Sequence, residues 1–175
     1  REFVAGRDEF TTNIGILADN TPVLGIVGAP ASGTIWRGVV GEGAERLSMA
    51  GAEEISIPVP IRTRASRADQ IVAVVSRSHL DANTVAFLDA RAIGTRLTAG
   101  SSLKFCRLAE GEADIYPRLS PINEWDIAAG HAILEAAGGT ILTEDGSRLR
   151  YGRLDRRLLV PSFIAYGDRA LAGRR

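Results

Sequence analysis

The amino-acid sequence predicts a layered α/β fold, in which an antiparallel sheet precedes a sheet covered by helices. The first forty residues contain short β-branched segments separated by turn residues, which is typical of antiparallel strands. From residue 71 onward, short apolar runs alternate with segments of helical spacing, which indicates strand–helix units. Hydrophobic residues make up 45% and charged residues 24% of the 175, so the chain can bury a globular core.

Three strands are predicted in the N-terminal part. Alternating or β-branched residues favour strands at 11–16, 23–27 and 34–40, and the residues between them have turn chemistry. We expect the glycine-rich stretch at 41–44 to end this meander. We interpret its glycines as a hairpin end and not as a nucleotide-binding loop, because no strand–helix unit surrounds them.

A domain boundary is predicted at about residue 65. Residues 50–70 form a polar connection that contains prolines and a run of arginines, and domain boundaries commonly fall in such segments. We therefore assign residues 1–65 to the antiparallel sheet of an N-terminal domain. Residues 66–175 are assigned to a C-terminal α/β domain.

The C-terminal part is predicted to alternate strands with helices. The predicted strands are at 71–75, 93–97, 113–116, 141–142 and 158–160. The predicted helices are at 80–90, 103–110, 125–137 and 163–172. The helix at 125–137 has the clearest signal, because its alanine-rich interior is followed by Gly138 and Gly139.

The composition limits the classes of partner. Lys plus Arg and Asp plus Glu both total 21, so no global basic field favours a nucleic-acid polymer, and any anion must be held by local groups. A single cysteine, Cys106, cannot form an internal disulfide, which fits a reducing cytoplasm. The sequence contains neither an apolar run of membrane-spanning length nor a signal-peptide pattern. Because the first residue is Arg1, we expect the chain to be the remainder of a longer protein.

Asp126 is the first candidate for chemistry, since it lies at the start of the predicted helix 125–137. The N-terminus of a helix stabilises an anionic carboxylate, and an ionised carboxylate is the ligand that Mg²⁺ requires. The alternative is that Asp126 is an ordinary helix N-cap. The surrounding residues by themselves leave both interpretations open.

The stretch at 99–111 offers a candidate anion site. Gly100, Ser101 and Ser102 precede a predicted helix, and Lys104 lies in its first turn. Backbone N–H groups, two hydroxyls and an ammonium at a helix start can together bind an anion. The alternative is a capping serine followed by a solvated lysine.

Two further residues follow predicted strands. Arg118 lies in a proline-flanked loop and could hold a phosphate bidentately. His79 follows the predicted strand 71–75, and ligands bind at the carboxyl ends of strands in α/β sheets. The alternatives are a solvated arginine and a surface or capping histidine. His131, inside the helix 125–137, is interpreted as a packing or surface residue.

Several motifs together resemble one family. The segment Trp-Asp…Ala-Gly-His-Ala…Ala-Gly-Gly at 125–139 is similar to the C-terminal signature of the inositol monophosphatase superfamily. The segments Gly-Ser-Ser-Leu-Lys-Phe at 100–105 and Ala-Asp-Ile-Tyr-Pro-Arg at 113–118 resemble its 3′(2′),5′-bisphosphate nucleotidase (CysQ-type) branch. The opening residues at 1–3 and 9–14 resemble the text after that family's Asp-Pro-Leu-Asp-Gly-Thr motif.

The resemblance implies an α/β/α/β/α sandwich, here lacking its N-terminal part, and phosphate-ester hydrolysis by a water that Mg²⁺ activates. It implies that Asp126 is a catalytic residue and metal ligand. The family's other metal ligands are a Glu on an N-terminal helix and both Asp residues of Asp-Pro-Leu-Asp-Gly-Thr. All of these would lie upstream of Arg1, so we expect the chain alone to be inactive.

In the nucleotidase branch, the resemblance assigns substrate contacts to His79, Ser101, Lys104 and Arg118, with Gly100 and Ser102 lining the same loop. Simple inositol monophosphatases have an acidic residue near the position of Arg118, and an arginine there suits a second phosphate.

The expected substrate is therefore adenosine 3′,5′-bisphosphate, a small phosphorylated nucleotide, and the expected reaction is removal of its 3′-phosphate. An inositol-phosphate or sugar-phosphate phosphatase is the alternative within the family. A non-catalytic anion-binding module is the alternative outside enzymes. We expect a cytoplasmic protein and leave open a homodimer and an association with the inner face of the membrane.

Overall fold

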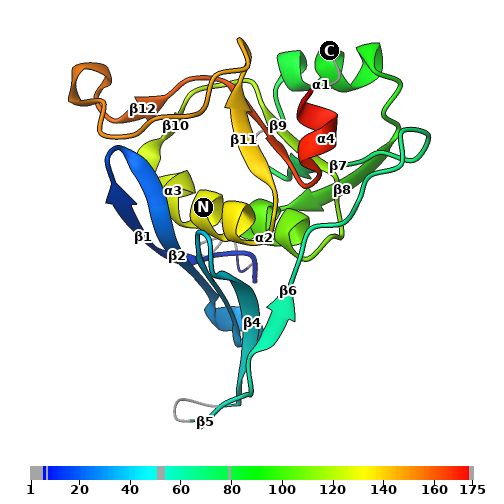
Figure 1. The fold of residues 1–175 in the computed structure, drawn as a ribbon. Helices are drawn as coiled ribbons and strands as arrows, with labels where there is room; N and C mark the ends of the chain where they lie inside the picture. The colour runs from blue at the N-terminus through cyan, green and yellow to red at the C-terminus, as the bar shows by residue number, and fades with distance from the viewer. Residues whose placement is uncertain (1–5, 7, 51–53, 79, 174–175) are drawn as a thin grey trace.

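The computed structural model describes residues 6, 8–50, 54–78 and 80–173. These residues form alternating layers, namely a first sheet, an inner helical layer, a second sheet and an outer helical layer (Figure 1). The inner helices are α2 (Leu103–Ala109) and α3 (Glu124–Ala136), and the outer helices are α1 (Ala82–Ala90) and α4 (Arg169–Ala172). The layered α/β fold predicted from the sequence is confirmed.

The first sheet is antiparallel and runs in the order β1-β2-β3-β4-β5, while β6 also pairs with β4. Its strands are β1 (Thr12–Ala18), β2 (Thr21–Ala29), β3 (Thr34–Val39), β4 (Gly43–Ala50), β5 (Glu54–Ile55) and β6 (Val59–Ile61). A short 3-10 helix, Pro30–Ser32, joins β2 to β3. The three strands predicted in this part of the chain are present.

The prediction that the meander ends at residues 41–44 is wrong. Gly41 and Gly43 have φ angles of +92° and +131°, and they form a tight turn after which the chain returns as β4. The predicted connection at 50–70 contains β5 and β6, which both pair with β4. The glycines therefore mark a hairpin turn inside the sheet, and the sheet extends beyond them.

The second sheet runs in the order β11-β13-β9-β7-β8. Its strands are β7 (Val72–Ser76), β8 (Thr95–Ala99), β9 (Ile115–Arg118), β11 (Thr140–Thr143) and β13 (Phe163–Tyr166). Strand β7 is parallel to β8 and β9, whereas β13 is antiparallel to both of its neighbours. Separately, β10 (Ile122–Asn123) pairs with β12 (Leu159–Val160), and a 3-10 helix lies at Leu154–Arg156.

The predicted helix at 163–172 is wrong over its first half. Phe163 and Ala165 are fully buried within β13, which forms backbone hydrogen bonds with a strand on each side. Aromatic and β-branched residues suit such a central strand, and pairing on both sides outweighs any local helical preference. Only Arg169–Ala172 forms the helix α4.

Helix α3 packs directly against the first sheet. A Cβ atom added to Gly25 would overlap the carbonyl oxygen of Ala129, and one added to Gly15 would lie 3.0 Å from the Ala129 nitrogen. One hydrophobic cluster continues from Trp36 of the first sheet to Phe163 of the second. The predicted domain boundary near residue 65 stays a prediction, and α3 contacts sheets on both sides of it in the sequence.

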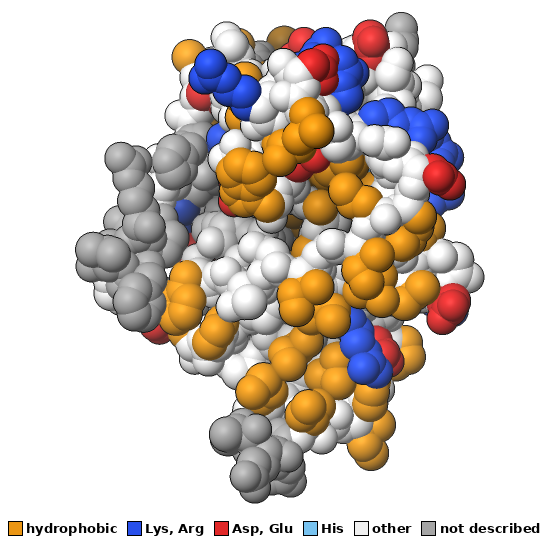
Figure 2. All heavy atoms as spheres, turned by 90° about the vertical axis from the view of Figure 1, so that its left-hand side faces the viewer, with side chains coloured by type: hydrophobic (Ala, Val, Ile, Leu, Met, Phe, Trp, Pro, Cys, Tyr) orange, Lys and Arg blue, Asp and Glu red, His pale blue; other side chains and the backbone are white. Residues whose placement is uncertain are grey.

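The opposite face of the first sheet is apolar and uncovered within the described part of the chain. Ile14 and Ile16 alternate with Gly15, so they point away from α3, and they are 54% and 51% exposed. Figure 2 shows apolar side chains spread over this side of the molecule, with a few charged side chains among them. None of the helices in the described ranges is both long and apolar enough to cross a membrane.

Replacing Gly25 by alanine should separate β2 from α3. We expect Gly25→Ala to lower the free energy of unfolding by about 2–3 kcal/mol, because the new methyl group has no space beside Ala129. Gly28→Ala is the matched control, since a Cβ atom at Gly28 on the same strand meets no atom within 4 Å. Urea unfolding of the two variants measures the difference, and equal midpoints would contradict the packing described here.

Candidate active site

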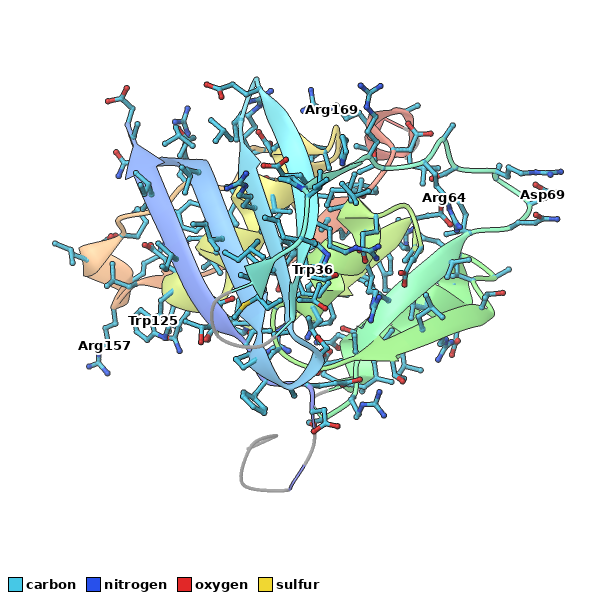
Figure 3. The ribbon with its side chains drawn as sticks, turned by 90° about the horizontal axis from the view of Figure 1, so that it is seen from below. Trp36, Arg64, Asp69, Trp125, Arg157 and Arg169 are labelled. Carbon is cyan, nitrogen blue, oxygen red and sulfur yellow. The ribbon has the colours of Figure 1, made fainter. Side chains whose placement is uncertain are left out.

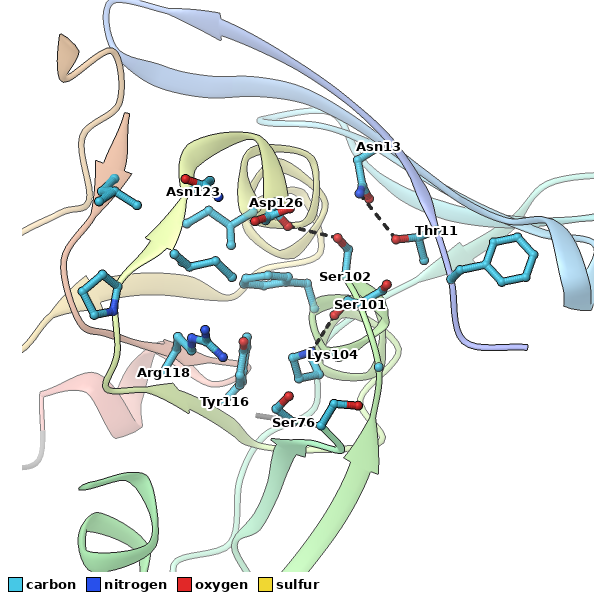
Figure 4. Close-up of a pocket in the computed structure, with 18 residues that line it drawn as sticks. Thr11, Asn13, Ser76, Ser101, Ser102, Lys104, Tyr116, Arg118, Asn123 and Asp126 are labelled. Atoms are coloured by element: carbon cyan, nitrogen blue, oxygen red, sulfur yellow. Dashed lines mark hydrogen bonds between the residues drawn. The ribbon is translucent and has the colours of Figure 1, made fainter. Parts of the chain in front are cut away.

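A cleft of about 490 Å³ opens between the two sheets, beside the starts of α2 and α3 (Figure 4). Of the residues predicted to bind substrate or metal, those that line it are Gly100, Ser101, Ser102, Lys104, Arg118 and Asp126. These residues come from separate parts of the sequence, and the fold brings them to one cavity. His79 lies outside the described residues.

Asp126 is the third residue of α3, and Asn123 occupies the N-cap position. The interpretation of Asp126 as the N-cap is therefore wrong. Its carboxylate is exposed at the cleft, and within the described ranges it has no hydrogen-bond donor or cation as a partner. The first turn of a helix favours a negative charge. Asp126 is thus available to hold a cation in the cleft.

The loop between β8 and α2 forms one wall of the cleft. Ser101 has a φ angle of +46°, a left-handed conformation that costs a non-glycine residue about 1–2 kcal/mol. The Lys104 ammonium donates a hydrogen bond of 2.6 Å to the Ser101 carbonyl oxygen and one of 3.4 Å to that of Ala99. The Ser102 hydroxyl donates one of 3.0 Å to the carbonyl oxygen of Asp126. The loop is therefore tied internally by Lys104 and externally to α3.

Lys104 is buried, and the alternative of a solvated lysine is therefore wrong. Only 6% of the residue is exposed, and its ammonium lies 5.4 Å from the centre of the Tyr116 ring. The ammonium contributes positive charge to the cleft while it holds the loop. Its contact with substrate stays a prediction.

Arg118 ends β9 on the side of the cleft that faces α3. Its Nε donates a hydrogen bond of 3.2 Å to the Ser120 carbonyl oxygen, which orients the guanidinium. Nearby, Asp81 caps α1. Although burial favours its neutral form, hydrogen bonds from Thr84 and the charge of Arg118 hold the pKa of Asp81 below its ordinary value. Arg118 therefore adds a positive charge to this wall.

Several residues of the cleft were not found by sequence reasoning. Ser76 and Ser78 lie at the carboxyl end of β7, the same feature that drew attention to His79, and could have been proposed on that ground. Asn13 lines the cleft from β1, and its Oδ1 atom is buried without a hydrogen-bond partner among the described residues. No sequence pattern distinguishes Asn13, since only its place in the sheet turns it toward the cleft.

The start of α3 is held by the loop that follows β11. The buried Glu124 carboxylate accepts hydrogen bonds of 2.8 Å and 3.0 Å from the backbone N–H groups of Gly152 and Arg153. Trp125, beside Asp126, is 58% exposed and lies on the same side of the molecule as Arg157 (Figure 3). The first turn of α3 thus has fixed backbone partners, and so does the position of Asp126.

His131 holds the same loop further along α3. Its Nδ1 lies 2.8 Å from the Tyr151 hydroxyl, and both residues are buried. Burial raises the pKa of Tyr151 well above its ordinary value, so the phenol is neutral. The histidine therefore packs in the interior and does not line the cleft. This agrees with its interpretation from the sequence as a packing residue.

Asp114 anchors the strand that carries Arg118. This buried carboxylate accepts two hydrogen bonds from Arg64, of 2.7 and 2.9 Å, and one each from the Ser66 hydroxyl and the Val72 N–H. Burial opposes ionisation, but these hydrogen bonds and the Arg64 charge outweigh it and hold the pKa of Asp114 below its ordinary value. Arg64 lies on the side of the molecule opposite Trp125 (Figure 3).

The fold and the cleft have counterparts among known proteins. The sequence profile of the inositol monophosphatase family matches residues 1–173 of this chain. The chain belongs to the inositol monophosphatase family. Its 38% identity to the 3′(2′),5′-bisphosphate nucleotidase CysQ of Escherichia coli (strain K12) extends over 151 residues, 86% of this chain and 58% of that protein.

Solved structures of this family show the same layers. The crystal structure of CysQ from Bacteroides thetaiotaomicron is similar with a TM-score of 0.83 and 36% identity, over 95% of this chain and 65% of that one. An inositol monophosphatase from Zymomonas mobilis is similar with a TM-score of 0.77 and 26% identity, over 98% and 62%. The chain therefore spans about 58–65% of the length of these relatives.

Members of the inositol monophosphatase family are typically metal-dependent, and the cleft offers part of a metal site. Asp126 fits one ligand position, because it is an exposed carboxylate without a competing partner in the described ranges. Those ranges contain no group of three or more His, Cys, Asp or Glu residues that could hold a metal ion. A single carboxylate binds Mg²⁺ weakly, since the ion gives up its water reluctantly. Asp126 would therefore need further ligands.

Replacing Asp114 by asparagine should weaken the anchor of β9 in a pH-dependent way. The folded pKa of Asp114 is depressed, so its stabilisation is present above the unfolded pKa of about 4 and is lost as the pH falls through the folded pKa. We expect Asp114→Asn to lower the free energy of unfolding by about 2 kcal/mol at pH 7, because Arg64 would lose a charged partner. The loss should shrink below pH 4.

Urea unfolding at pH 7 and pH 3 measures this difference. Asp155→Asn is the control, since Asp155 is paired with Arg153 on an exposed loop and its removal should leave stability unchanged. A loss at pH 3 as large as that at pH 7 would show that charge is not the basis of the anchor.

Proposed function

We propose that the protein is a Mg²⁺-dependent phosphomonoesterase that removes the 3′-phosphate of adenosine 3′,5′-bisphosphate. The observation that carries this proposal is that Asp126 and Arg118 line the same cleft from different elements. One offers a carboxylate for a metal, and the other offers a cation for a second phosphate. The nucleotidase named among the similar proteins, CysQ, supports the same substrate.

Different residues of the cleft would bind different parts of the substrate. Asp126 would hold Mg²⁺ together with other ligands, and the bound ion would activate water and neutralise phosphate oxygens. Arg118 would hold the phosphate that is not hydrolysed, with its guanidinium already oriented by Ser120. Ser101 also lines the cleft, and its hydroxyl would be a further polar partner for the nucleotide.

Arg118 also separates this proposal from its alternatives. An inositol-phosphate or sugar-phosphate phosphatase needs acceptors for sugar hydroxyls, and a guanidinium has none. A non-catalytic anion-binding module would bind the bisphosphate without hydrolysing it. Phosphate release from adenosine 3′,5′-bisphosphate by the full-length protein with millimolar Mg²⁺ tests the proposal, and binding without release would refute it.

Asp126→Asn in the full-length protein should abolish most activity and leave the fold intact. The amide is nearly isosteric but carries no charge, so the metal site loses a ligand worth several kcal/mol, and activity should fall about a hundredfold or more. The side chain has no partner in the described ranges, so the melting temperature should not change. The measurement is activity against Mg²⁺ concentration beside a thermal melt. An active variant with unchanged metal dependence would contradict the role.

Arg118→Ala should discriminate between matched substrates. A charge-assisted hydrogen bond is worth about 1.5–3 kcal/mol, so kcat/KM for adenosine 3′,5′-bisphosphate should fall about ten- to a hundredfold. Adenosine 3′-phosphate lacks only the second phosphate, and its kcat/KM should change little. Equal losses on both nucleotides would move Arg118 to the phosphate that is hydrolysed. Lys104 is expected to follow Arg118 in specificity, but its variant also releases the loop that it holds.

A further inference from the structure

Glu9 is a charged residue beside the cleft that the proposed function does not use. Its carboxylate accepts hydrogen bonds of 2.9 Å and 2.7 Å from Nε and Nη2 of Arg77, which is a bidentate ion pair. The same carboxylate accepts a third hydrogen bond, of 2.7 Å, from the backbone N–H of Gly100. Arg77 adds a longer hydrogen bond of 3.4 Å to the Thr98 carbonyl oxygen.

These contacts join the segments that line one end of the cleft. Glu9 precedes Thr11 on the way into β1, Arg77 follows Ser76 at the end of β7, and Gly100 precedes Ser101 in the loop before α2. Figure 4 shows Thr11, Ser76 and Ser101 around the same opening. One carboxylate therefore ties together three segments that are far apart in the sequence.

The approach of Glu9 explains why residue 100 is a glycine. A Cβ atom at Gly100 would lie 2.9 Å from Glu9 Oε2 and 3.0 Å from Glu9 Cβ, so any side chain would push the carboxylate away. The Gly100 N–H, which the sequence suggested for a bound anion, already has an internal anion as its partner. At the next residue of the loop, the Lys104 ammonium donates a hydrogen bond to the Ser101 carbonyl oxygen. The loop is thus fixed between a negative and a positive side chain.

We infer that Glu9 is a positioning residue for substrate binding, one that sets the loop at Gly100–Ser102 and the end of β7 in the arrangement that receives the nucleotide. The inference rests on the proposed function for its substrate. Glu9 does not touch the reacting phosphate in this role. Glu9 affects how tightly the substrate binds, because the position of the loop sets the positions of Ser101 and Ser102 in the cleft, and Ser101 has a strained backbone.

Glu9→Gln is a sharp test because it preserves the shape of the side chain while it removes the negative charge and replaces one of the two acceptor oxygens by a donor. Both carboxylate oxygens face N–H donors, Oε1 on Arg77 and Oε2 on Arg77 and Gly100. A glutamine has one oxygen and one amino group, so in either orientation a donor faces a donor. The contacts of the Glu9 side chain with Arg77 and Gly100, which we call the Glu9 clasp, must then lose a hydrogen bond at Arg77 or at Gly100.

The experiment uses the full-length protein with Glu9→Gln, and with Glu112→Gln as a matched control. Glu112 pairs with Arg107 on the surface and does not line the cleft. We expect Glu9→Gln to raise the KM for adenosine 3′,5′-bisphosphate about tenfold with kcat within about threefold of the parent. The control should change neither. A fall in kcat without a change in KM, or no change in either, would overturn the inference.

Amide hydrogen exchange gives a second readout that needs no activity. Glu9→Gln should speed exchange of the Gly100–Ser102 amides about tenfold or more and leave the interior of α3 unchanged. If the parent protein does not hydrolyse the bisphosphate, the proposed function fails, and this exchange still tests the clasp. Unchanged exchange at Gly100–Ser102 would overturn the positioning role, as would faster exchange throughout the protein, which indicates general destabilisation.

Discussion

The close contact between α3 and the first sheet is the constraint on which the rest of the structure depends. The backbone of β2 approaches that of the helix so closely that Gly25 leaves no space for a Cβ atom beside Ala129. Protein interiors are packed as densely as organic crystals, so such a contact has little freedom to slide. Because Asp126 lies at the start of this helix, the sheet determines where the carboxylate stands relative to the second sheet and its loops.

Buried hydrogen bonds, in addition to this packing, hold the elements around the cleft in place. Glu124 binds two backbone N–H groups of the loop after β11, Ser102 donates to the Asp126 carbonyl, and Asp114 holds the segment before β9. Each of these groups is buried, and a buried polar group that lost its partner would cost more than the bond contributes. The site is therefore positioned by interior hydrogen bonds, in a chain whose charges of either sign balance as a whole.

Much of this arrangement could be predicted, and the errors have a common cause. The strand at 71–75 and the helix at 125–137 have local patterns that agree with their final packing, and both are present. The sequence predicts a helix where the structure has the strand β13, because this strand depends on β9 and β11, which pair with it from distant positions. The sequence does not predict strand β4, because two glycines can end a sheet or turn within it, and only the pairing of β3 with β4 distinguishes these outcomes.

The sequence by itself determined the chemical groups of this protein. The Trp-Asp segment, the Gly-Ser-Ser-Leu-Lys loop and Arg118 identify the family and some of the residues that line the cleft, because each motif is local in the chain. Only the tertiary structure decided which partner each group takes. Glu9 accepts a hydrogen bond from the N–H of Gly100, which is 91 residues away in the sequence. The Lys104 ammonium donates a hydrogen bond to a carbonyl oxygen of its own loop. Hydrogen bonds depend on distances of about 3 Å in space, and residues so far apart in the sequence reach that distance only once the sheets and α3 have packed.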